Sequence, residues 1–292
     1  MQEIRSIKKV IPAMKVDMGG ILLDQALPYR GVDQIDPFLL VHHLKLTHEG
    51  GKRQEEVGVP PHPHRGFAPV TFIFEGGVHH RDSMDISSVV YKGGTQWMHA
   101  GSGVIHSERP PKELVGKDKT WELIQFWVNV PARYKMTAPN YQPLSYEDTP
   151  SVRSEDGKVE VGIVAGTFGD QKGGVETYSP ILALRLNFEK GGTIRIPVPK
   201  SFNAFVYQLD GQLTINDSQD IQAKDLTWLE NDGDYITLEA RETTRAILLA
   251  GEPIGEPLAT YGPFVMNTQS EIRQAMRDYQ MGKMGHLVEK FD

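Results

Sequence analysis

The amino-acid sequence predicts an all-β protein with two related sandwich or barrel domains, and three observations support this. Short apolar runs such as "APVTFIFEGG" and "AFVYQLDGQLTIND" end in turns that contain glycine, asparagine or aspartate. The 29 glycines and 19 prolines are spread along the chain, and evenly spaced short strands are typical of sandwiches and barrels. Finally, "APVTFIFEGGVHHRDS" in the first half resembles "NAFVYQLDGQLTINDS" in the second, which indicates two related β domains.

The domain boundaries are predicted from a polar stretch in the middle of the chain. Residues 138–158 contain three prolines and show no hydrophobic periodicity, so they are interpreted as a linker. We therefore expect an N-terminal domain over residues 1–137 and a C-terminal domain over residues 159–292.

One short helix is expected near the C-terminus. Ile272, Met276 and Tyr279 fall at helical spacing. A capping residue at Asn267 or Thr268 precedes them, and such a residue typically marks the start of a helix. The sequence therefore predicts that the second domain ends in a helical tail.

Composition excludes several classes of protein. The chain of 292 residues has 31 Lys and Arg against 38 Asp and Glu, a formal net charge of −7, which argues against direct nucleic-acid binding. There is no cysteine, so disulfides and thiolate metal sites are impossible. Neither a signal peptide nor an apolar run long enough to span a membrane is present, so we expect a cytoplasmic protein without membrane contact.

Two pairs of metal-ligating side chains stand out in the first half. His62 and His64 flank Pro63, and His106 and Glu108 have the same i, i+2 spacing. Side chains two residues apart on a strand share a face. On neighbouring strands, the two pairs would therefore direct three imidazoles and one carboxylate to one point. Pro63 lacks an N–H and fits a strand start or an edge strand.

The ligand set suits a divalent transition metal. A single His-x-His pair is more often a chance feature than a metal site, but its combination with a downstream His-x-Glu pair is much more specific. Imidazole suits iron, nickel, copper and zinc, and a carboxylate favours iron or manganese. His286 is the only histidine after residue 106, so we expect no metal site in the C-terminal domain.

Both halves resemble the cupin pattern, in which strands form a small jelly-roll barrel with glycine-rich turns. The stretch "HPHRGF…EGG…HRDS…GGTQWMHAGSGVIHSE" resembles the pirin family, a two-domain branch of the cupins, and "DPFLLVHH" and "GPFVMNTQSEIRQAMRDYQMGKMG" extend the resemblance over the chain. The resemblance implies a bicupin, with two double-stranded β-helix (jelly-roll) barrels and a short C-terminal helix.

The resemblance also implies a cofactor and its ligands. It implies one non-haem Fe(II) in the N-terminal cupin, held by His62, His64, His106 and Glu108, with copper, manganese, nickel, cobalt or zinc as alternatives. Many pirins have glutamate four residues after the second histidine of the first pair, where this chain has Ala68. The carboxylate ligand of pirins matches Glu108, so the site is expected to persist.

The other histidines of the first half are expected to be structural. His79 and His80 follow "EGG" and are interpreted as turn residues that are exposed or hydrogen-bonded. His99 lies seven residues before His106 and is expected to have a structural role, with a place beside the metal as the alternative.

Two functions from different classes remain open at this point. Some pirins cleave flavonols such as quercetin with dioxygen, which implies an enzyme with a small aromatic substrate and O2, in which Glu108 is also the candidate base. Other pirins are iron-dependent regulators that bind a protein partner, which implies a redox-sensing module without physiological turnover.

Overall fold

The chain folds into two compact units, each assembled from two separate segments. The computed structural model describes residues 3–47, 50–116 and 118–291. Contacts group the chain into residues 1–40 with 147–253, and residues 41–146 with 254–292. We call the second group the histidine unit because it contains all ten histidines, and the first the histidine-free unit.

These units differ from the predicted domains at both ends of the chain. The first 40 residues group with the second half, because β1 (Ile7–Pro12) pairs with β22 (Asp225–Leu229). The predicted helical tail groups instead with the first half. Hydrophobic alternation gives the face of a strand but not the partner it will pair with. For this reason the sequence could not predict that each terminal segment groups with the other half of the chain.

The histidine unit is built from two antiparallel sheets. One has the strand order β5 (Val59–His64), β10 (Val104–Arg109), β7 (Gly77–Asp82) and β8 (Ser87–Tyr91). The other sheet has seven strands, and those that belong mainly to this unit have the order β12 (Asn140–Leu144), β9 (Thr95–His99), β6 (Phe67–Glu75), β11 (Thr120–Asn129) and β4 (Phe38–Thr47). The unit also contains the 3-10 helices η1 (Gln54–Glu56), η2 (Lys112–Leu114) and η3 (Ala132–Tyr134). The strand β12 lies in the predicted linker, which is therefore partly structured.

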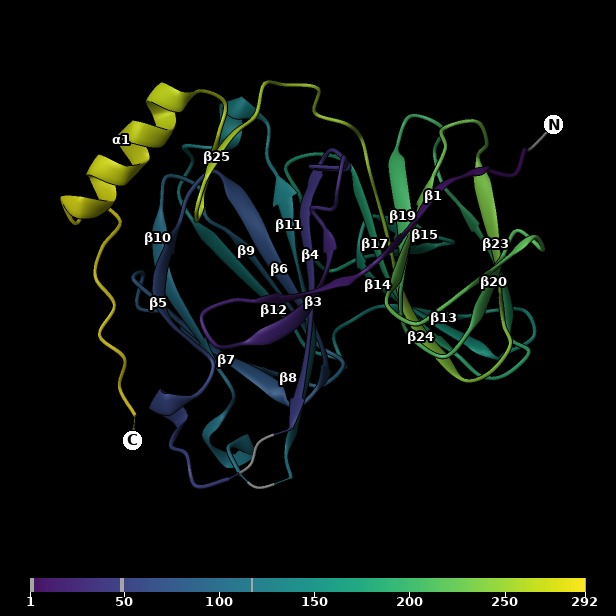
Figure 1. Ribbon diagram of the computed structural model, residues 1–292, viewed down its shortest axis with the longest axis horizontal. Coiled ribbons are helices and arrows are strands. Elements are labelled where there is room, and N and C mark those ends of the chain that lie inside the picture. Colours follow the sequence, from purple (N-terminus) through teal and green to yellow (C-terminus); the bar gives the residue numbers. More distant parts are fainter. Residues whose placement is uncertain (1–2, 48–49, 117, 292) are drawn as a thin grey trace. The chain divides into compact units, whose positions relative to one another are not determined.

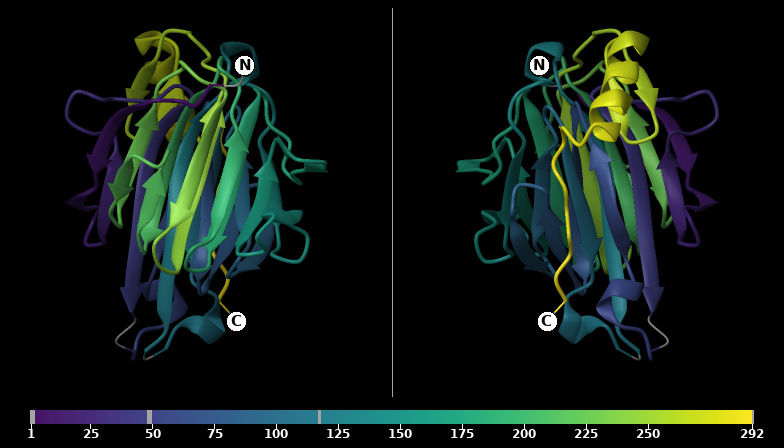
Figure 2. Two further views of the ribbon diagram at one scale, coloured as in Figure 1. Left: turned by 90° about the vertical axis from the view of Figure 1, so that its right-hand side faces the viewer. Right: turned by 90° about the vertical axis from the view of Figure 1, so that its left-hand side faces the viewer.

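The histidine-free unit repeats this architecture. Its larger sheet has the order β1, β22, β19 (Asn203–Asp210), β24 (Thr244–Gly251), β17 (Ile181–Phe188), β14 (Val159–Ala165) and β13 (Ser151–Arg153). Its smaller sheet has the order β18 (Thr193–Pro197), β23 (Tyr235–Ala240), β20 (Leu213–Ile215) and β21 (Gln219–Ile221). Two hairpins join β2 (Met14–Asp17) to β3 (Leu22–Leu27) and β15 (Thr167–Phe168) to β16 (Gln171–Lys172). Figure 2 (left) shows its long strands side by side.

The C-terminal segment covers part of the histidine unit. A hairpin of β25 (Ala259–Tyr261) and β26 (Phe264–Met266) precedes α1 (Gln269–Gln280), which Figure 1 shows beside β25. Thr268 caps the helix in a capping box with Glu271, as the sequence predicts. Beyond α1 the tail runs along the sheet (Figure 2, right), where Glu289 pairs with Arg109 at 2.8 Å.

The two-barrel, all-β fold class is therefore confirmed. The core of the histidine-free unit is almost purely aliphatic and includes Ile196, Val206, Ile236 and Leu248. Among the described residues no helix is long and apolar enough to span a membrane.

Candidate metal centre

Two paired strands carry the histidines predicted as ligands. His62 and His64 lie on β5, and His106 lies on β10 directly opposite His62. Strand alternation points the i, i+2 pair to one face, so both residues of β5 approach His106. Pro63 is tolerated because β5 is the edge strand of its sheet, where a missing N–H breaks no ladder bond.

The three imidazoles form a compact cluster. Their ligand nitrogens all lie within 4.8 Å of one another, and His64 and His106 are buried while His62 is half-buried. Ring centroids are 4.4 Å apart for His62 and His106, 4.7 Å for His62 and His64, and 5.0 Å for His64 and His106. Three nitrogens at this spacing can share one metal ion.

Hydrogen bonds occupy one nitrogen of each ring and leave the other for a metal. The Nδ1 atom of His62 lies 2.8 Å from the carbonyl oxygen of Pro60, and that of His64 lies 3.3 Å from the carbonyl oxygen of Pro263. The buried Nε2 atom of His106 has no hydrogen-bond partner among the described residues. Metal-ligating histidines typically have this arrangement, in which the second nitrogen is hydrogen-bonded to the protein, so the residues present fit a metal.

Burial favours the neutral form that a ligand needs. Burial lowers the pKa of His64 well below its usual value, and the neighbouring His62 lowers it further. The pKa of His106 is lowered for the same reason, with contributions from His62, His64 and His80. Neutral imidazole has a lone pair to donate, so metal binding does not first require the loss of a proton.

Glu108, the predicted fourth ligand, lies outside the cluster. Its Oε1 accepts from Thr71 at 3.2 Å and from the amide of Gln96, and its Oε2 accepts from the amide of Gln125 at 2.8 Å. These donors come from β6, β9 and β11 of the opposite sheet. The carboxylate is therefore held inside the barrel by three polar side chains, and its ligand role stays a prediction.

His80 and Asp82 are two functional candidates that the sequence interpretation missed. His80 lies in β7 rather than in a turn and is fully buried. Its Nδ1 lies 3.4 Å from Nδ1 of His106, its Nε2 lies 2.9 Å from Oδ2 of Asp82, and its ring stacks on Tyr141. The i, i+2 spacing of His80 and Asp82 is the same signal that singled out the other two pairs, and it could have identified them.

The two remaining histidines named from the sequence, His79 and His99, contact hydroxyl groups outside the cluster. His79 faces away from His80 on the same strand, and its Nε2 contacts the Ser87 hydroxyl at 2.9 Å. His99 contacts the Thr137 hydroxyl at 3.0 Å, and burial lowers its pKa to about 4. This agrees with the expectation of a structural role for His99.

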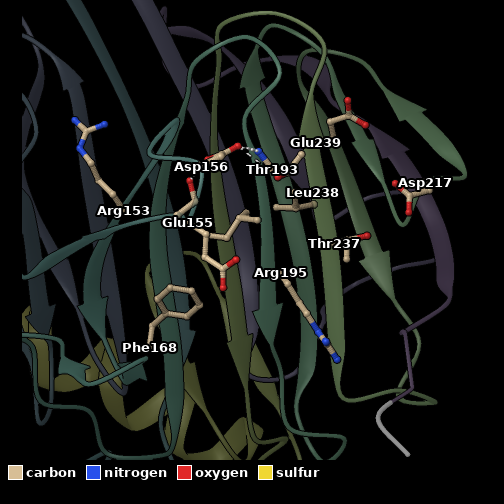
Figure 3. A pocket seen from close by; sticks show the side chains of 12 residues that line it. Arg153, Glu155, Asp156, Phe168, Thr193, Arg195, Asp217, Thr237, Leu238 and Glu239 are labelled. Atoms are coloured by element: carbon tan, nitrogen blue, oxygen red, sulfur yellow. Dashed lines mark hydrogen bonds between the residues drawn. The ribbon is translucent and has the colours of Figure 1, made fainter.

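A separate hollow of about 640 Å³ lies on the histidine-free unit (Figure 3). Several of its polar side chains are already paired. Asp156 accepts from Ser154, Lys158 and Thr193, and the Ser154 hydrogen bond is the main cause that lowers its pKa to about 2. Arg195 lies 3.6 Å from the centre of the Tyr235 ring. The hollow contains no histidine, so the candidate chemistry stays with the histidine unit.

Comparison with known proteins identifies relatives of both halves. The family model described as Pirin matches residues 21–128, and the model described as the Pirin C-terminal cupin domain matches residues 183–285. Pirin-like protein 2 of Arabidopsis thaliana is 36% identical over 98% of this chain and 87% of its own length. Each match falls within one predicted domain, which agrees with two cupin barrels.

Two solved structures share the fold over most of the chain. Quercetin 2,3-dioxygenase from Acinetobacter baumannii superposes with a TM-score of 0.91 at 32% identity, covering 98% of this chain and all of that one. The bacterial pirin YhhW of Escherichia coli, solved in complex with nickel(II), superposes with a TM-score of 0.67 at 16% identity over 84% of this chain and 99% of its own. At that identity the second likeness concerns the fold alone.

Proposed function

Because this chain belongs to the pirin family, we propose that its histidine unit binds one divalent transition metal and cleaves a flavonol such as quercetin with dioxygen. Fe(II) is the first candidate, and copper, manganese, nickel, cobalt and zinc are alternatives. His62, His64 and His106 are the proposed ligands, with Glu108 as the fourth. The proposal has support from the likeness to the quercetin 2,3-dioxygenase of A. baumannii.

The observation that carries the proposal is the buried Nε2 of His106, which has no hydrogen-bond partner in the part of the chain that the structure describes. A buried polar atom without a partner costs about 1–3 kcal/mol, and native proteins keep few of them. Here the atom lies in a cluster whose ligand nitrogens are within 4.8 Å of one another. A metal ion would satisfy all three imidazoles at once, which explains why the chain retains this arrangement.

A bound metal would supply Lewis acidity and a path for electrons between the flavonol and O2. The chain itself would hold and orient the substrate. Phe67 and Trp127 pack against His64 at ring distances of 5.1 and 5.7 Å, which provides an aromatic wall beside the cluster. The half-buried His62 marks the more accessible side.

Glu108 is proposed to act as ligand and, secondarily, as the base that accepts the flavonol hydroxyl proton. Both roles need a lone pair of the carboxylate, while Thr71, Gln96 and Gln125 already donate to it. Each carboxylate oxygen can accept more than one hydrogen bond, so these three donors leave lone pairs of Glu108 available. The same hydrogen bonds limit how far the carboxylate can move.

Oxygen uptake with quercetin tests the proposal. The protein is stripped of metal, reloaded with each candidate metal in turn, and assayed for O2 consumption and bleaching of the quercetin absorbance. We expect turnover with incorporation of both atoms of labelled O2, and its loss in His62→Ala. Glu108→Gln keeps the size of the side chain but removes its charge, so metal binding with slow turnover would assign it the base role.

Metal binding without turnover by any loaded form would overturn the enzymatic proposal. It would favour the alternative of an iron-dependent regulatory module with a protein partner. Failure of the protein to bind any metal would overturn both.

A further inference from the structure

We propose that Asp82 and His80 set the tautomer of His106 and so keep its Nε2 lone pair available to a metal. The inference rests on the proposed function, because that proposal supplies the metal. Its main test, however, uses the metal-free protein. His80 and Asp82 would be positioning residues that act through His106. The argument rests on a chain of three buried side chains on two paired strands.

The three side chains share one face of the paired strands β7 and β10. His106 is the register partner of Asp82, and Glu108 is the partner of His80. The side chains of His80 and Asp82 are fully buried and that of His106 is almost so. Distances of 2.9 Å between His80 and Asp82 and 3.4 Å between His80 and His106 connect them in sequence. Water therefore does not compete for these hydrogen bonds.

The orientation of Asp82 is determined by the backbone of the following turn. Its Oδ1 accepts from the N–H groups of Met84 at 2.8 Å and Ile86 at 3.1 Å. Its Oδ2 therefore faces Nε2 of His80. An ionised carboxylate can only accept, so His80 carries its proton on Nε2.

The tautomer of His106 follows from that of His80. In its neutral form with the proton on Nε2, His80 has a lone pair at Nδ1, which faces Nδ1 of His106. His106 then donates from Nδ1, and its own lone pair lies at Nε2, the atom with no partner among the described residues. Tyr141 stacks on His80 at 4.0 Å with an interplanar angle of 12°, which keeps the His80 ring in the required plane.

Long-range ¹H–¹⁵N spectra of histidine-labelled, metal-free protein test this order of protons. We expect His106 to be protonated at Nδ1 and His80 at Nε2. A wild-type spectrum with His106 protonated at Nε2 overturns the inference without any variant. Because no metal or substrate is present, this outcome is independent of whether the protein is an oxygenase.

Asp82→Asn provides the sharpest variant. The amide oxygen keeps the Met84 and Ile86 hydrogen bonds, so the NH2 group faces His80. His80 must then accept at Nε2 and donate from Nδ1, which moves the His106 proton to Nε2. We expect this tautomer switch, together with a 10- to 100-fold weaker affinity for added Zn²⁺ or Ni²⁺, the usual cost of losing such a partner.

Substitutions at His80 and its neighbour separate positioning from packing. His80→Asn places an amide oxygen near the Nδ1 position and is expected to keep the His106 tautomer, whereas His80→Leu removes the acceptor and is expected to lose it. His79→Leu changes the adjacent histidine on the opposite face and should alter neither tautomer nor affinity. Equal affinities for His80→Leu and His80→Asn would overturn the inference, as would an unchanged His106 tautomer in Asp82→Asn.

Discussion

The two units of this protein have matching strand orders but differ in the side chains at equivalent interior positions. The order β5-β10-β7-β8 in the histidine unit corresponds to β18-β23-β20-β21 in the histidine-free unit, and β9-β6-β11 corresponds to β22-β19-β24. The internal similarity found in the sequence links β6 and β7 to β19 and β20, in agreement with these orders. The strand registers then give residue-by-residue equivalents.

Four residues of the metal centre correspond to aliphatic ones in the other unit. The registers give the pairs His62 and Ile196, His80 and Ile215, His106 and Ile236, and Glu108 and Leu238. Two of the three residues that hold Glu108 follow the same rule, since Thr71 and Gln125 correspond to Val206 and Leu248, whereas Gln96 corresponds to the buried Thr227.

The comparison teaches that the barrel does not need a polar interior. Aliphatic side chains at the same positions form a continuous core, and buried polar groups cost stability unless they are hydrogen-bonded. A cluster of buried histidines in one of two similar barrels therefore indicates a binding role. Aliphatic residues at the equivalent positions are enough to fill the interior of the other barrel. Substituting the residue found at the equivalent position of the other unit tests this conclusion.

The largest effect is expected from His106→Ile, which introduces the residue found at position 236. Metal binding should be lost, because the Nε2 donor at the centre of the cluster is removed. The metal-free protein should be no less stable than the wild type, since the substitution also removes a buried nitrogen without a partner among the described residues. Calorimetric titration with Zn²⁺ and urea unfolding measure the two quantities. Retained metal affinity would contradict the role of His106.

Core packing gives the next largest effect, and here the two units should respond differently. Leu248→Ala leaves a cavity in an aliphatic core and should lower the free energy of unfolding by about 2–5 kcal/mol. Gln125→Ala, at the equivalent position, removes a half-buried hydrogen bond to Glu108 and should cost about 1 kcal/mol. Trp228 lies in the histidine-free unit and the other three tryptophans in the histidine unit, so fluorescence-detected urea unfolding can monitor both. Equal costs would contradict the difference between the cores.

A smaller loss is expected when a histidine is placed in the aliphatic core. Ile236→His introduces one imidazole opposite Ile196, where neither a second ligand nor a hydrogen-bonding partner corresponds to those of His106. Burying it unsatisfied should cost about 1–3 kcal/mol without creating metal affinity. Urea unfolding and titration with Zn²⁺ check both statements, and unchanged stability would show that this interior tolerates polar groups.

The sequence could predict which face a side chain occupies but not which strand it meets. Alternation correctly placed His62 with His64, and the edge position of Pro63 followed from its missing N–H. The contact between His80 and His106 depends on the register of two strands separated by a long stretch of chain, which alternation does not specify.

The position of Glu108 could not be predicted for a related reason. Its two oxygens are held by Gln96, Gln125 and Thr71 from the opposite sheet. Whether these side chains reach Glu108 depends on how the two sheets pack, and a local sequence pattern does not predict that packing. The pairing of β1 with β22 was beyond the sequence for the same reason, because an edge strand carries no signal of its distant partner.

The last expected effect is a histidine titration confined to the histidine unit. Burial lowers the pKa of His99 to about 4, whereas the unfolded chain has a histidine pKa of about 6.5. Between these values the unfolded state binds a proton that the folded state excludes. The contribution of His99 is therefore complete above about pH 6.5 and is lost as the pH falls toward 4. The histidine-free unit has no such group, so its unfolding should show no histidine step. His99→Gln can still hydrogen-bond Thr137 but does not titrate. It should reduce the loss of stability of the histidine unit between pH 7 and pH 5, measured by urea unfolding at both values, and an unchanged slope would mean that His99 is protonated in the folded protein.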